Sequence, residues 1–451
     1  MSSDAPVSQK QSGWRRYINR LLAAEISTFA RYYDRVIQWM PRADDSGILL
    51  DAIDSAQKGV IREGGLFPSL AGEKESRTVV LINGNFNYNY DIQATLMELK
   101  PSLARTSRLA LVVYNSYFSW LYQLANKLRI RKGDCPTTFL TRTDIENLNK
   151  LTGYTTVRAR PVVYFPFRLL GIGDVVNRLF MAVPGLRWFS LAYVVILKPN
   201  ISEDPVSLPS LSCIIPARNE RGNIENAMRR MPDLGCRLEV IFVEGHSNDG
   251  TWEEILRVKE KYGDRFDIKA CRQQGKGKSD AVRLGFAMAN AELLTILDAD
   301  LTMPPELLGR FYTAYCNGLA DFVNGSRLVY PMEGSAMRFL NRLGNIFFAK
   351  ASSMTLETSI GDSLCGTKLL ARHDYRRMTA WRKDFGEFDP FGDFELLFPA
   401  ALLGLGIVDV PIRYRDRTYG QTNINRFQHG AMLFQMVVIG FLRIRMGSGE
   451  L

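Results

Sequence analysis

The stretch 293–308, LLTILDADLTMPPELL, places two carboxylates at the end of an apolar run that predicts a buried β-strand. Asp298 and Asp300 lie one residue apart, so their charges repel and both are costly to desolvate. A strand that ends in this way needs a cationic partner at its end, or a wet cleft. Carboxylate oxygens suit Mg²⁺ or Mn²⁺, and the spacing lets both side chains aim at one ion. Asp is also an ordinary turn residue, so the pair alone indicates a metal site only weakly.

Upstream of this stretch, strand and helix patterns alternate. Strands are predicted in LSCIIPARNE (211–220), which we expect to break at Pro216, in LEVIFVEG (238–245) and in FDIKACRQ (266–273). Helices are predicted in 222–231, 251–263 and 277–291. This alternation predicts a parallel sheet with right-handed crossovers, in which ligands bind beyond the carboxyl ends of the strands. The polar clusters PARNE, EGHSNDGT and DAD each follow a strand, so we expect them at that edge.

The length of the chain, 451 residues, predicts two or three domains. The Pro- and Ser-rich segment 197–211, LKPNISEDPVSLPSL, is the clearest linker. Six cysteines and three histidines show no CxxC pair and no zinc-like spacing, so a His/Cys metal centre is not expected. We expect reduced, mostly buried thiols and a cytoplasmic location.

The net charge of +10 is typical of a solvated basic surface, and it also suits anionic substrates or an anionic membrane face. No nucleic-acid motif is present, so nucleic acid is not an expected partner. The N-terminus lacks the apolar core of a signal peptide, and no window reaches the roughly 18–20 apolar residues of a spanning helix. Apolar segments with basic ends, 337–354 and 426–445, suit either a core position or a membrane interface. A peripheral position on the cytoplasmic membrane face is therefore a second expectation.

Four segments in order, IIPARNE, VIFVEGHSNDGT, QGKGKSDAVRLGF and LLTILDADLTMPPE, resemble the family 2 glycosyltransferases with a GT-A fold. The likeness is greatest to dolichyl-phosphate mannosyltransferase-like and related polyprenyl-phosphate enzymes, and it covers about 208–442. It implies an α/β, Rossmann-like fold. It also implies metal-dependent, inverting transfer of a hexose from a nucleotide diphosphate sugar to a lipid-phosphate or glycan acceptor.

The resemblance also implies roles for matched residues. Asp298 and Asp300 would hold Mg²⁺ or Mn²⁺, and Asp393 would be the catalytic carboxylate on the acceptor side, with Glu395 as the alternative. An acceptor phosphate is already anionic and needs no base, in which case Asp393 would position it. The implied substrate-binding residues are Pro216, Arg218, Asn219, Glu220, Glu244, Asp249, Lys276, Lys278, Asp298, Ala299, Arg327, Asp362, Arg415 and Arg417.

Among these residues, Glu244 departs from the family pattern, which usually has aspartate there to hold the base or ribose. Lys276 and Lys278 lie on a glycine-rich loop that enters a helix, a place that favours phosphate. Arg415 and Arg417 would face phosphate because the arginine fork suits it. The plainer interpretations are a capped turn for SNDGT, solvated surface for the lysines and a solvated edge strand for the arginines.

The first half of the chain also has α/β patterns. The segment 79–115 resembles the later half of a class I S-adenosylmethionine methyltransferase, and the likeness covers about 33–198. Such enzymes have a Gly-rich turn after their first strand. The corresponding place here, 47–65, reads GILLDAIDSAQKGVIREGG without a GxGxG. We therefore expect a shortened, degenerate domain that does not bind S-adenosylmethionine.

These observations predict an N-terminal tail and helix at 1–30, a methyltransferase-like domain at 31–200 and a GT-A domain at 208–451 that ends in an amphipathic helix. Two alternatives stay open from the sequence. One is an S-adenosylmethionine-dependent methyltransferase with an auxiliary GT-A domain. The other is a non-catalytic scaffold that binds nucleotide sugar.

Overall fold

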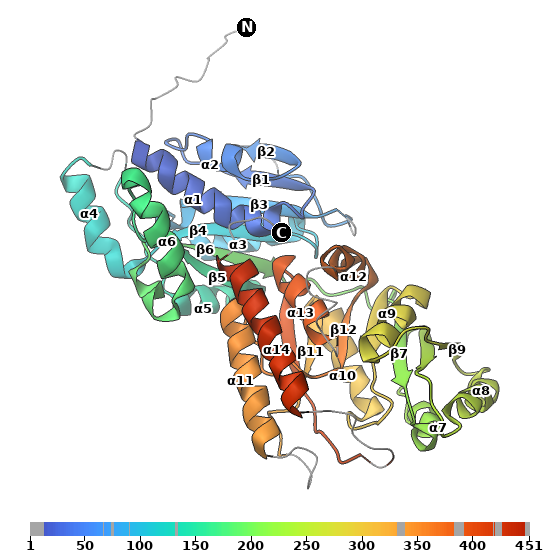
Figure 1. The fold of residues 1–451 in the computed structure, drawn as a ribbon. Coiled ribbons are helices and arrows are strands. Elements are labelled where there is room, and N and C mark those ends of the chain that lie inside the picture. The colour runs from blue at the N-terminus through green and yellow to red at the C-terminus, as the bar shows by residue number, and fades with distance from the viewer. Residues whose placement is uncertain are drawn as a thin grey trace. The chain divides into compact units, whose positions relative to one another are not determined.

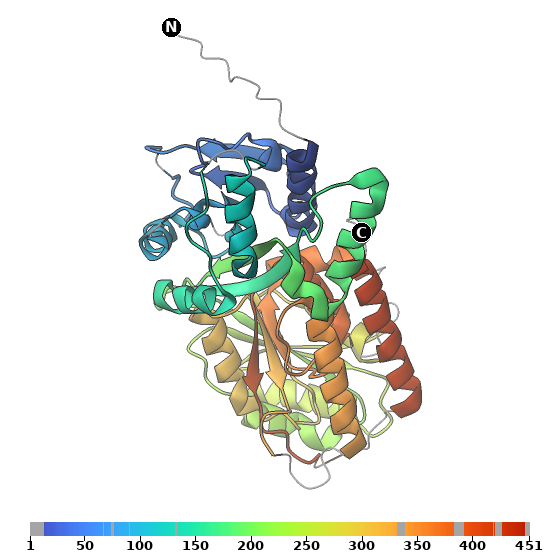
Figure 2. The ribbon, with the colours of Figure 1, turned by 90° about the vertical axis from the view of Figure 1, so that its left-hand side faces the viewer.

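The computed structural model describes residues 13–65, 67–73, 76–89, 91–130, 134–331, 339–382, 392–417, 419 and 426–446. The chain divides into two compact units, with the division between Pro199 and Asn200. Each unit is an α/β unit with its own Rossmann-like sheet and helices packed on it (Figures 1 and 2). The division falls inside the Pro- and Ser-rich segment 197–211.

The first unit is built on a six-stranded sheet of order β2-β1-β3-β4-β6-β5. Neighbouring strands are parallel from β2 to β4, whereas β6 is antiparallel to both β4 and β5. The strands are β1 Arg35–Trp39, β2 Gln57–Ile61, β3 Thr78–Asn83, β4 Arg108–Tyr114, β5 Tyr154–Val162 and β6 Ala192–Pro199. The α-helices are α1 Gly13–Ala30, α2 Ile48–Ala52, α3 Ile92–Leu99, α4 Ser119–Lys127, α5 Arg142–Thr152 and α6 Ile172–Ala182.

Helix α1 is held on this sheet by apolar packing and by a buried charge cluster. Phe29, on the buried side of α1, is fully buried in the core of the unit. Glu25 of the same helix is 3.0 Å from Arg158 and 3.0 Å from Arg160, both on β5. A buried carboxylate is tolerated because these guanidinium groups pair with it.

The stretch 47–65, which we matched to the Gly-rich turn, does not follow the first strand of this sheet. It forms helix α2 and the edge strand β2. The turn after β1 is 40–47, MPRADDSG, and it too has no GxGxG. The turn after the first strand therefore lies before the stretch that we matched to it, because residues 48–61 form a helix and the next strand.

The second unit is built on a seven-stranded sheet of order β13-β11-β12-β10-β7-β8-β9. Strands β10, β7, β8 and β9 are parallel, β12 is antiparallel to β10 and β11, and β13 is parallel to β11. The strands are β7 Leu211–Ala217, β8 Leu238–Glu244, β9 Asp267–Arg272, β10 Leu293–Ile296, β11 Phe322–Ser326, β12 Lys368–Ala371 and β13 Ile407–Pro411. The α-helices are α7 Arg221–Arg229, α8 Thr251–Tyr262, α9 Lys278–Met288, α10 Leu308–Cys316, α11 Phe339–Leu356, α12 Arg372–Met378, α13 Asp393–Leu402 and α14 Arg426–Gly440.

The alternation of elements predicted between 211 and 300 is confirmed, with one correction. We expected the first strand to break at Pro216, but β7 continues to Ala217 and Pro216 is in register with Val243 of β8. Proline removes one N–H donor. Because this residue is next to last in the strand, the ladder loses little there.

The six cysteines are all free thiols, with Cys213, Cys316 and Cys365 buried and the other three half-buried. In the part of the chain that the structure describes, no helix is both long and apolar enough to cross a membrane. Helices α11 and α14 pack side by side, and the rings of Phe347 and Phe434 stack with centroids 6.3 Å apart (Figure 1).

Candidate functional site

The carboxyl ends of β7, β8 and β10 bring three polar loops to one edge of the second sheet. Register places Ile296 of β10 beside Ile214 of β7, and Ala217 of β7 beside Glu244 of β8. The loops that leave these strands therefore start next to one another. Parallel sheets bind ligands at such an edge.

Asp298 lies against a lysine from the start of α9. Its Oδ1 is 2.5 Å from Nζ of Lys278. Burial alone would raise the pKa of the Asp298 carboxyl, but Lys278, with Lys368 and Arg327, outweighs burial and holds that pKa below its ordinary value. A methyl group at Gly366 would lie 2.1 Å from Nζ of Lys278 and 2.6 Å from an Asp298 oxygen. Gly366 therefore lies directly against this ion pair and leaves it room.

Asp300 has a cationic partner of its own, from a different part of the chain. Its Oδ2 is 2.6 Å from Nη2 of Arg417, and its Oδ1 accepts hydrogen bonds from the amide and the hydroxyl of Thr302. Arg417 also lies 3.4 Å from Glu220, in the loop after β7. Each carboxylate of the DAD motif thus has a separate basic partner, which offsets the cost of desolvating the pair.

Glu220 is buried and carries a strongly perturbed carboxyl group. Burial raises its pKa to about 7, the nearby charges of Asp300 and Asp249 add to the increase, and Asn223 and Arg417 oppose it. Asn223 donates a hydrogen bond of 2.7 Å to Oε2 of Glu220. Perturbed carboxyl groups gather at functional sites, which supports the assignment of this edge.

The loops after β7 and β8 are tied together by hydrogen bonds. Asn219 adopts a left-handed backbone with φ of 56°, and its side chain accepts a hydrogen bond of 3.0 Å from the amide of Asn248. The Asn219 amide in turn donates to the hydroxyl of Ser247 over 3.0 Å. An αL asparagine costs less than most residues there, so these bonds hold the loop in a defined shape.

The two acidic residues expected to contact the nucleotide differ in their surroundings. Glu244 is buried at the end of β8 and accepts a hydrogen bond from the Ser247 amide. Asp249 accepts hydrogen bonds from the Arg221 amide, over 3.2 Å, and from the Tyr419 hydroxyl, also over 3.2 Å.

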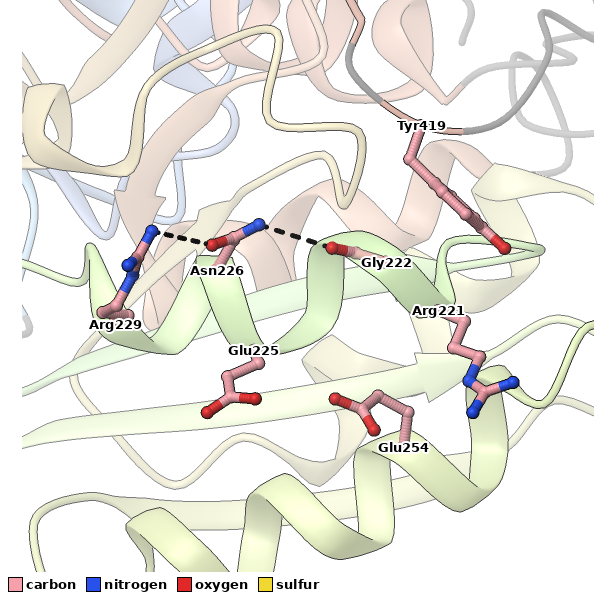
Figure 3. A pocket seen from close by; sticks show the side chains of 7 residues that line it. All are labelled: Arg221, Gly222, Glu225, Asn226, Arg229, Glu254 and Tyr419. Atoms are coloured by element: carbon pink, nitrogen blue, oxygen red, sulfur yellow. Dashed lines mark hydrogen bonds between the residues drawn. The ribbon is translucent and has the colours of Figure 1, made fainter.

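The Tyr419 ring packs on Gly222, where an added methyl group would come within 2.7 Å of the ring. Tyr419 and helix α7 line a hollow of about 690 Å³ (Figure 3). Its acidic side chains, Glu225 and Glu254, extend from α7 and α8 toward the same space, and Arg257 bridges them. This hollow borders the loop that carries Asp249, but Asp298 and Asp300 are not among its lining residues.

On the other side of β10, Arg327 follows β11 and forms a two-pronged ion pair with Asp362. The distances are 2.7 Å from Nε to Oδ2 and 2.9 Å from Nη2 to Oδ1. Asp362 is fully buried, and it also accepts hydrogen bonds from the amides of Arg327 and Leu364. Arg327 in this arrangement is engaged with a carboxylate of its own chain.

Asp393, at the start of α13, is buried and pairs with a lysine that we did not single out from the sequence. Nζ of Lys368 lies 2.5 Å from Oδ1 of Asp393, and the Lys368 side chain is fully buried. The sequence signal was available, because Lys368 directly precedes the apolar residues 369–371 in a short strand. The alternative carboxylate, Glu395, is bound by Arg283 at 2.6 Å and by Arg382 at 3.2 Å.

Comparison with known proteins identifies the family. The model of glycosyl transferase family 2 matches residues 212–378. The dolichyl-phosphate hexose transferase of Haloferax volcanii is 31% identical over 205 residues, which are 45% of this chain and 80% of that relative. The dolichol-phosphate mannosyltransferase of Mycosarcoma maydis is 32% identical over 253 residues, 54% of this chain and 82% of the relative. The chain belongs to glycosyl transferase family 2.

A further relative of this glycosyltransferase is the dolichol-phosphate mannosyltransferase of Pyrococcus furiosus, which is 29% identical over 222 residues. That match covers 48% of this chain and 59% of the relative, so the chain spans about three fifths of that relative's length. Among solved structures, a mannosyltransferase from Pyrobaculum calidifontis in complex with GDP-Man and Mn²⁺ has 17% sequence identity and a TM-score of 0.39. That likeness covers 55% of this chain and 75% of the other.

The remaining predicted residues of the glycosyltransferase unit lie at or near the same edge. Ala299 is buried between the two aspartates, whereas Arg218 and Lys276 have exposed side chains in the loops after β7 and β9. Arg415 is exposed and donates its amide to the Thr302 carbonyl over 2.9 Å. This bond joins the segment after β13 to the loop of the DAD motif.

The donor set at this edge fits a divalent ion that a substrate helps to bind. Within the described residues, no three His, Cys, Asp or Glu side chains gather closely enough to hold a metal by themselves. Asp298 and Asp300 supply hard carboxylate oxygens, the ligand type that Mg²⁺ and Mn²⁺ take when substrate phosphates complete the coordination. Their present partners, Lys278 and Arg417, are cations that suit those phosphates.

Proposed function

We propose that the second unit transfers a hexose from a nucleotide diphosphate sugar to a lipid phosphate, with inversion at the sugar and with Mg²⁺ or Mn²⁺. The observation that carries the proposal is the pairing at the end of β10, Asp298 with Lys278 and Asp300 with Arg417. Family membership supports the reaction class. The names of the relatives that act on dolichyl phosphate support the acceptor class.

The charges at the site suit a metal–diphosphate donor. Two carboxylates and two basic side chains balance one another before substrate arrives. A divalent ion held by Asp298 and Asp300 would offset the charge that develops on the leaving diphosphate. Lys278 and Arg417 would then turn to the phosphate oxygens, which arginine can bind in two-pronged fashion.

For the nucleotide itself, we propose the loops after β7 and β8 as the binding surface. Asn219, Glu220 and Asp249 lie there in a hydrogen-bonded frame, and Glu244 is buried at its base. Glu244 in place of the usual aspartate can still accept hydrogen bonds from a base or ribose. Arg218, in the same loop after β7, has an exposed basic side chain.

Asp393 is proposed to orient the acceptor rather than to accept a proton. Its carboxylate pairs with the fully buried Lys368, and an acceptor phosphate already carries the charge needed for attack. Burial would lower the pKa of the Lys278 ammonium, but the nearby charges of Asp298 and Asp393 together raise it. Asp393 therefore lies near the Asp298–Lys278 pair. The acceptor would thus meet the donor beside the Asp298–Lys278 pair.

For the first unit we propose a methyltransferase-like fold that does not bind S-adenosylmethionine. Its strand order, with β6 antiparallel between β4 and β5, supports the fold. The turn 40–47 supports the loss of the cofactor, since it has no GxGxG and its Asp45 is engaged by the side chains of Gln38 and Asn83 at 2.7 and 2.8 Å.

The deciding experiment measures sugar transfer from GDP- and UDP-sugars to a polyprenyl phosphate in detergent, with Mn²⁺, with Mg²⁺ and with chelator. We expect turnover with one donor that requires metal and is lost in Asp298→Asn. Asp264→Asn is the matched control, because this exposed aspartate lies before β9, at the opposite end of that strand. Full turnover of Asp298→Asn, or methyl transfer from S-adenosylmethionine without sugar transfer, would overturn the proposal.

A parallel binding measurement names the donor's base. A ligand that binds only the folded state stabilises it by about 2.7 kcal/mol at a hundredfold excess over its dissociation constant. We expect a metal-dependent rise in the unfolding midpoint with one nucleoside diphosphate. Binding without turnover on any acceptor would favour the non-catalytic scaffold instead.

A further inference from the structure

Helices α4 and α6 of the first unit carry apolar stripes that face solvent. On α6, Ile172, Val175 and Leu179 are 61%, 58% and 51% exposed. On α4 and the residue that follows it, Trp120, Leu124 and Leu128 are 58%, 42% and 59% exposed, and no residue of α4 is buried. A helix of a globular protein normally turns such a stripe toward the core. Among the described residues, neither stripe has the partner that its pattern calls for.

The turn before α6 holds two leucines in solvent at the cost of backbone strain. Leu169 and Leu170 have φ of 36° and 55°, the left-handed region that β-carbon-bearing residues rarely adopt. They are 56% and 106% exposed. Backbone strain that a fold retains often occurs at functional positions. Here the strained conformation presents two apolar side chains at the tip of a turn.

The two helices and their flanking turns form one surface. The rings of Tyr117, just before α4, and Trp188, after α6, lie 5.4 Å apart. The Asn115 side chain donates to the Trp188 carbonyl over 3.1 Å and so fixes the junction. Figure 1 shows α4 and α6 on the same side of the first unit, and Figure 2 views that side directly. We call the exposed side of α4, α6 and the turns 165–171 and 184–189 the α4–α6 surface.

The charge around this surface is strongly positive. The described segments 117–130 and 165–189 contain five Lys and Arg and one acidic residue, Asp174. That carboxylate is 3.1 Å from Arg168. Helix α1 adds to the positive charge, because its Arg20 is near enough to help lower the pKa of Asp174. Apolar side chains ringed by basic ones are the composition that binds anionic lipid interfaces.

We propose that the α4–α6 surface docks the protein on an anionic lipid bilayer, with Leu169 and Leu170 entering the interface. A second copy of the chain fits less well, because a two-fold contact would set this basic surface against itself. The inference goes beyond the proposed transfer reaction, since it assigns a partner to the unit that supplies no residue to the site. Vesicle binding needs neither donor nor acceptor, so each proposal can fail without the other.

The test is co-sedimentation of the full chain with vesicles of phosphatidylcholine alone or mixed with phosphatidylglycerol. We expect binding to the mixed vesicles that weakens with salt. The variant Leu169→Ser/Leu170→Ser should bind at least about tenfold more weakly, since burying even one leucine side chain is worth roughly that factor. A second variant, Lys127→Glu/Arg129→Glu, alters exposed residues and should lose binding to the anionic vesicles selectively.

Two controls locate the contact. Leu256→Ser changes a leucine of α8 that is 45% exposed, and it should bind as the parent does. Phe347→Ser/Phe434→Ser changes the exposed rings of α11 and α14 and should keep most of the binding.

The inference is overturned if both α4–α6 variants bind normally, or if only the α11–α14 variant loses binding. It is overturned as well if the parent protein binds neither kind of vesicle. A parent that is dimeric in solution and becomes monomeric in Leu169→Ser/Leu170→Ser would assign the surface to self-association instead.

Discussion

Replacing Glu220 by glutamine should change how the stability of this glycosyltransferase depends on pH. The unfolded chain loses the Glu220 proton near the ordinary pKa of 4.5, whereas the folded protein keeps it to about 7 because the group is buried. Between these values the folded state holds more protons, so the free energy of unfolding falls as pH rises. The contribution of protonated Glu220 to the free energy of unfolding is fully present below a pH of about 4.5 and is lost as pH rises through about 7.

The size of the effect follows from the two pKa values. A difference of one in pKa corresponds to about 1.4 kcal/mol, so the difference between 4.5 and about 7 corresponds to about 3 kcal/mol. Glutamine keeps an oxygen for the hydrogen bond from Asn223 and carries no charge. Glu220→Gln should therefore match the parent in acid and exceed its free energy of unfolding by about 3 kcal/mol at alkaline pH.

The assay is urea unfolding of both proteins over this pH range, with chelator and without nucleotide, so that no ligand contributes. Glu225→Gln on the same helix is the matched control, because Lys261 and Arg257 lower the pKa of the half-buried Glu225 to about 2. Glu225→Gln should be less stable than the parent at neutral pH and match it only in strong acid. This effect on stability is opposite in sign to that of Glu220→Gln. Parallel pH profiles for Glu220→Gln and the parent would refute the argument that burial sets this pKa.

Three further changes test the site. Gly366→Ala should fold, because the flexible ends of Lys278 and Asp298 can move, but it should lower kcat about 100-fold by displacing them; unchanged kcat would show that the pair is not at the reaction centre. Lys368→Met should lower the free energy of unfolding by about 3–5 kcal/mol, because Asp393 stays buried without its ammonium, and Lys368→Met/Asp393→Asn should recover part of this in the same urea assay. A Lys368→Met protein as stable as the parent would contradict this explanation. Asp298→Asn should abolish the metal-dependent rise in melting temperature with nucleotide, and retention of that rise would remove Asp298 from the ligand set.

The elements of the second unit could be predicted from the sequence because their signals are local. An apolar run that meets a polar turn marked the end of β8 and the end of β10. The order of the motifs indicated the family, and the comparisons confirmed it. Pro216 shows where a local rule failed, since one missing donor near a strand end is tolerated.

The partners of the site residues could not be predicted in the same way. Asp300 and Arg417 are 117 residues apart, and their contact depends on the path of the chain after β13. Lys368 reaches Asp393 from a different element, and a lysine in an apolar strand does not by itself name its counter-charge. Which side chains lie at the edge of the sheet could be predicted, but which of them neutralise one another is settled only by the fold.

The two internal ion pairs of the DAD motif give the resting enzyme its own counter-ions. Lys278 and Arg417 occupy the carboxylates that a free metal ion would otherwise attract, so an incoming cation must compete with two tethered ones. A metal–nucleotide complex would have the advantage, because its phosphates would offer the displaced lysine and arginine new partners as its cation takes their place. Under the proposed function, loading would be an exchange of partners in which every charge keeps a counter-charge, and the site would favour the assembled metal–donor complex over its separate components.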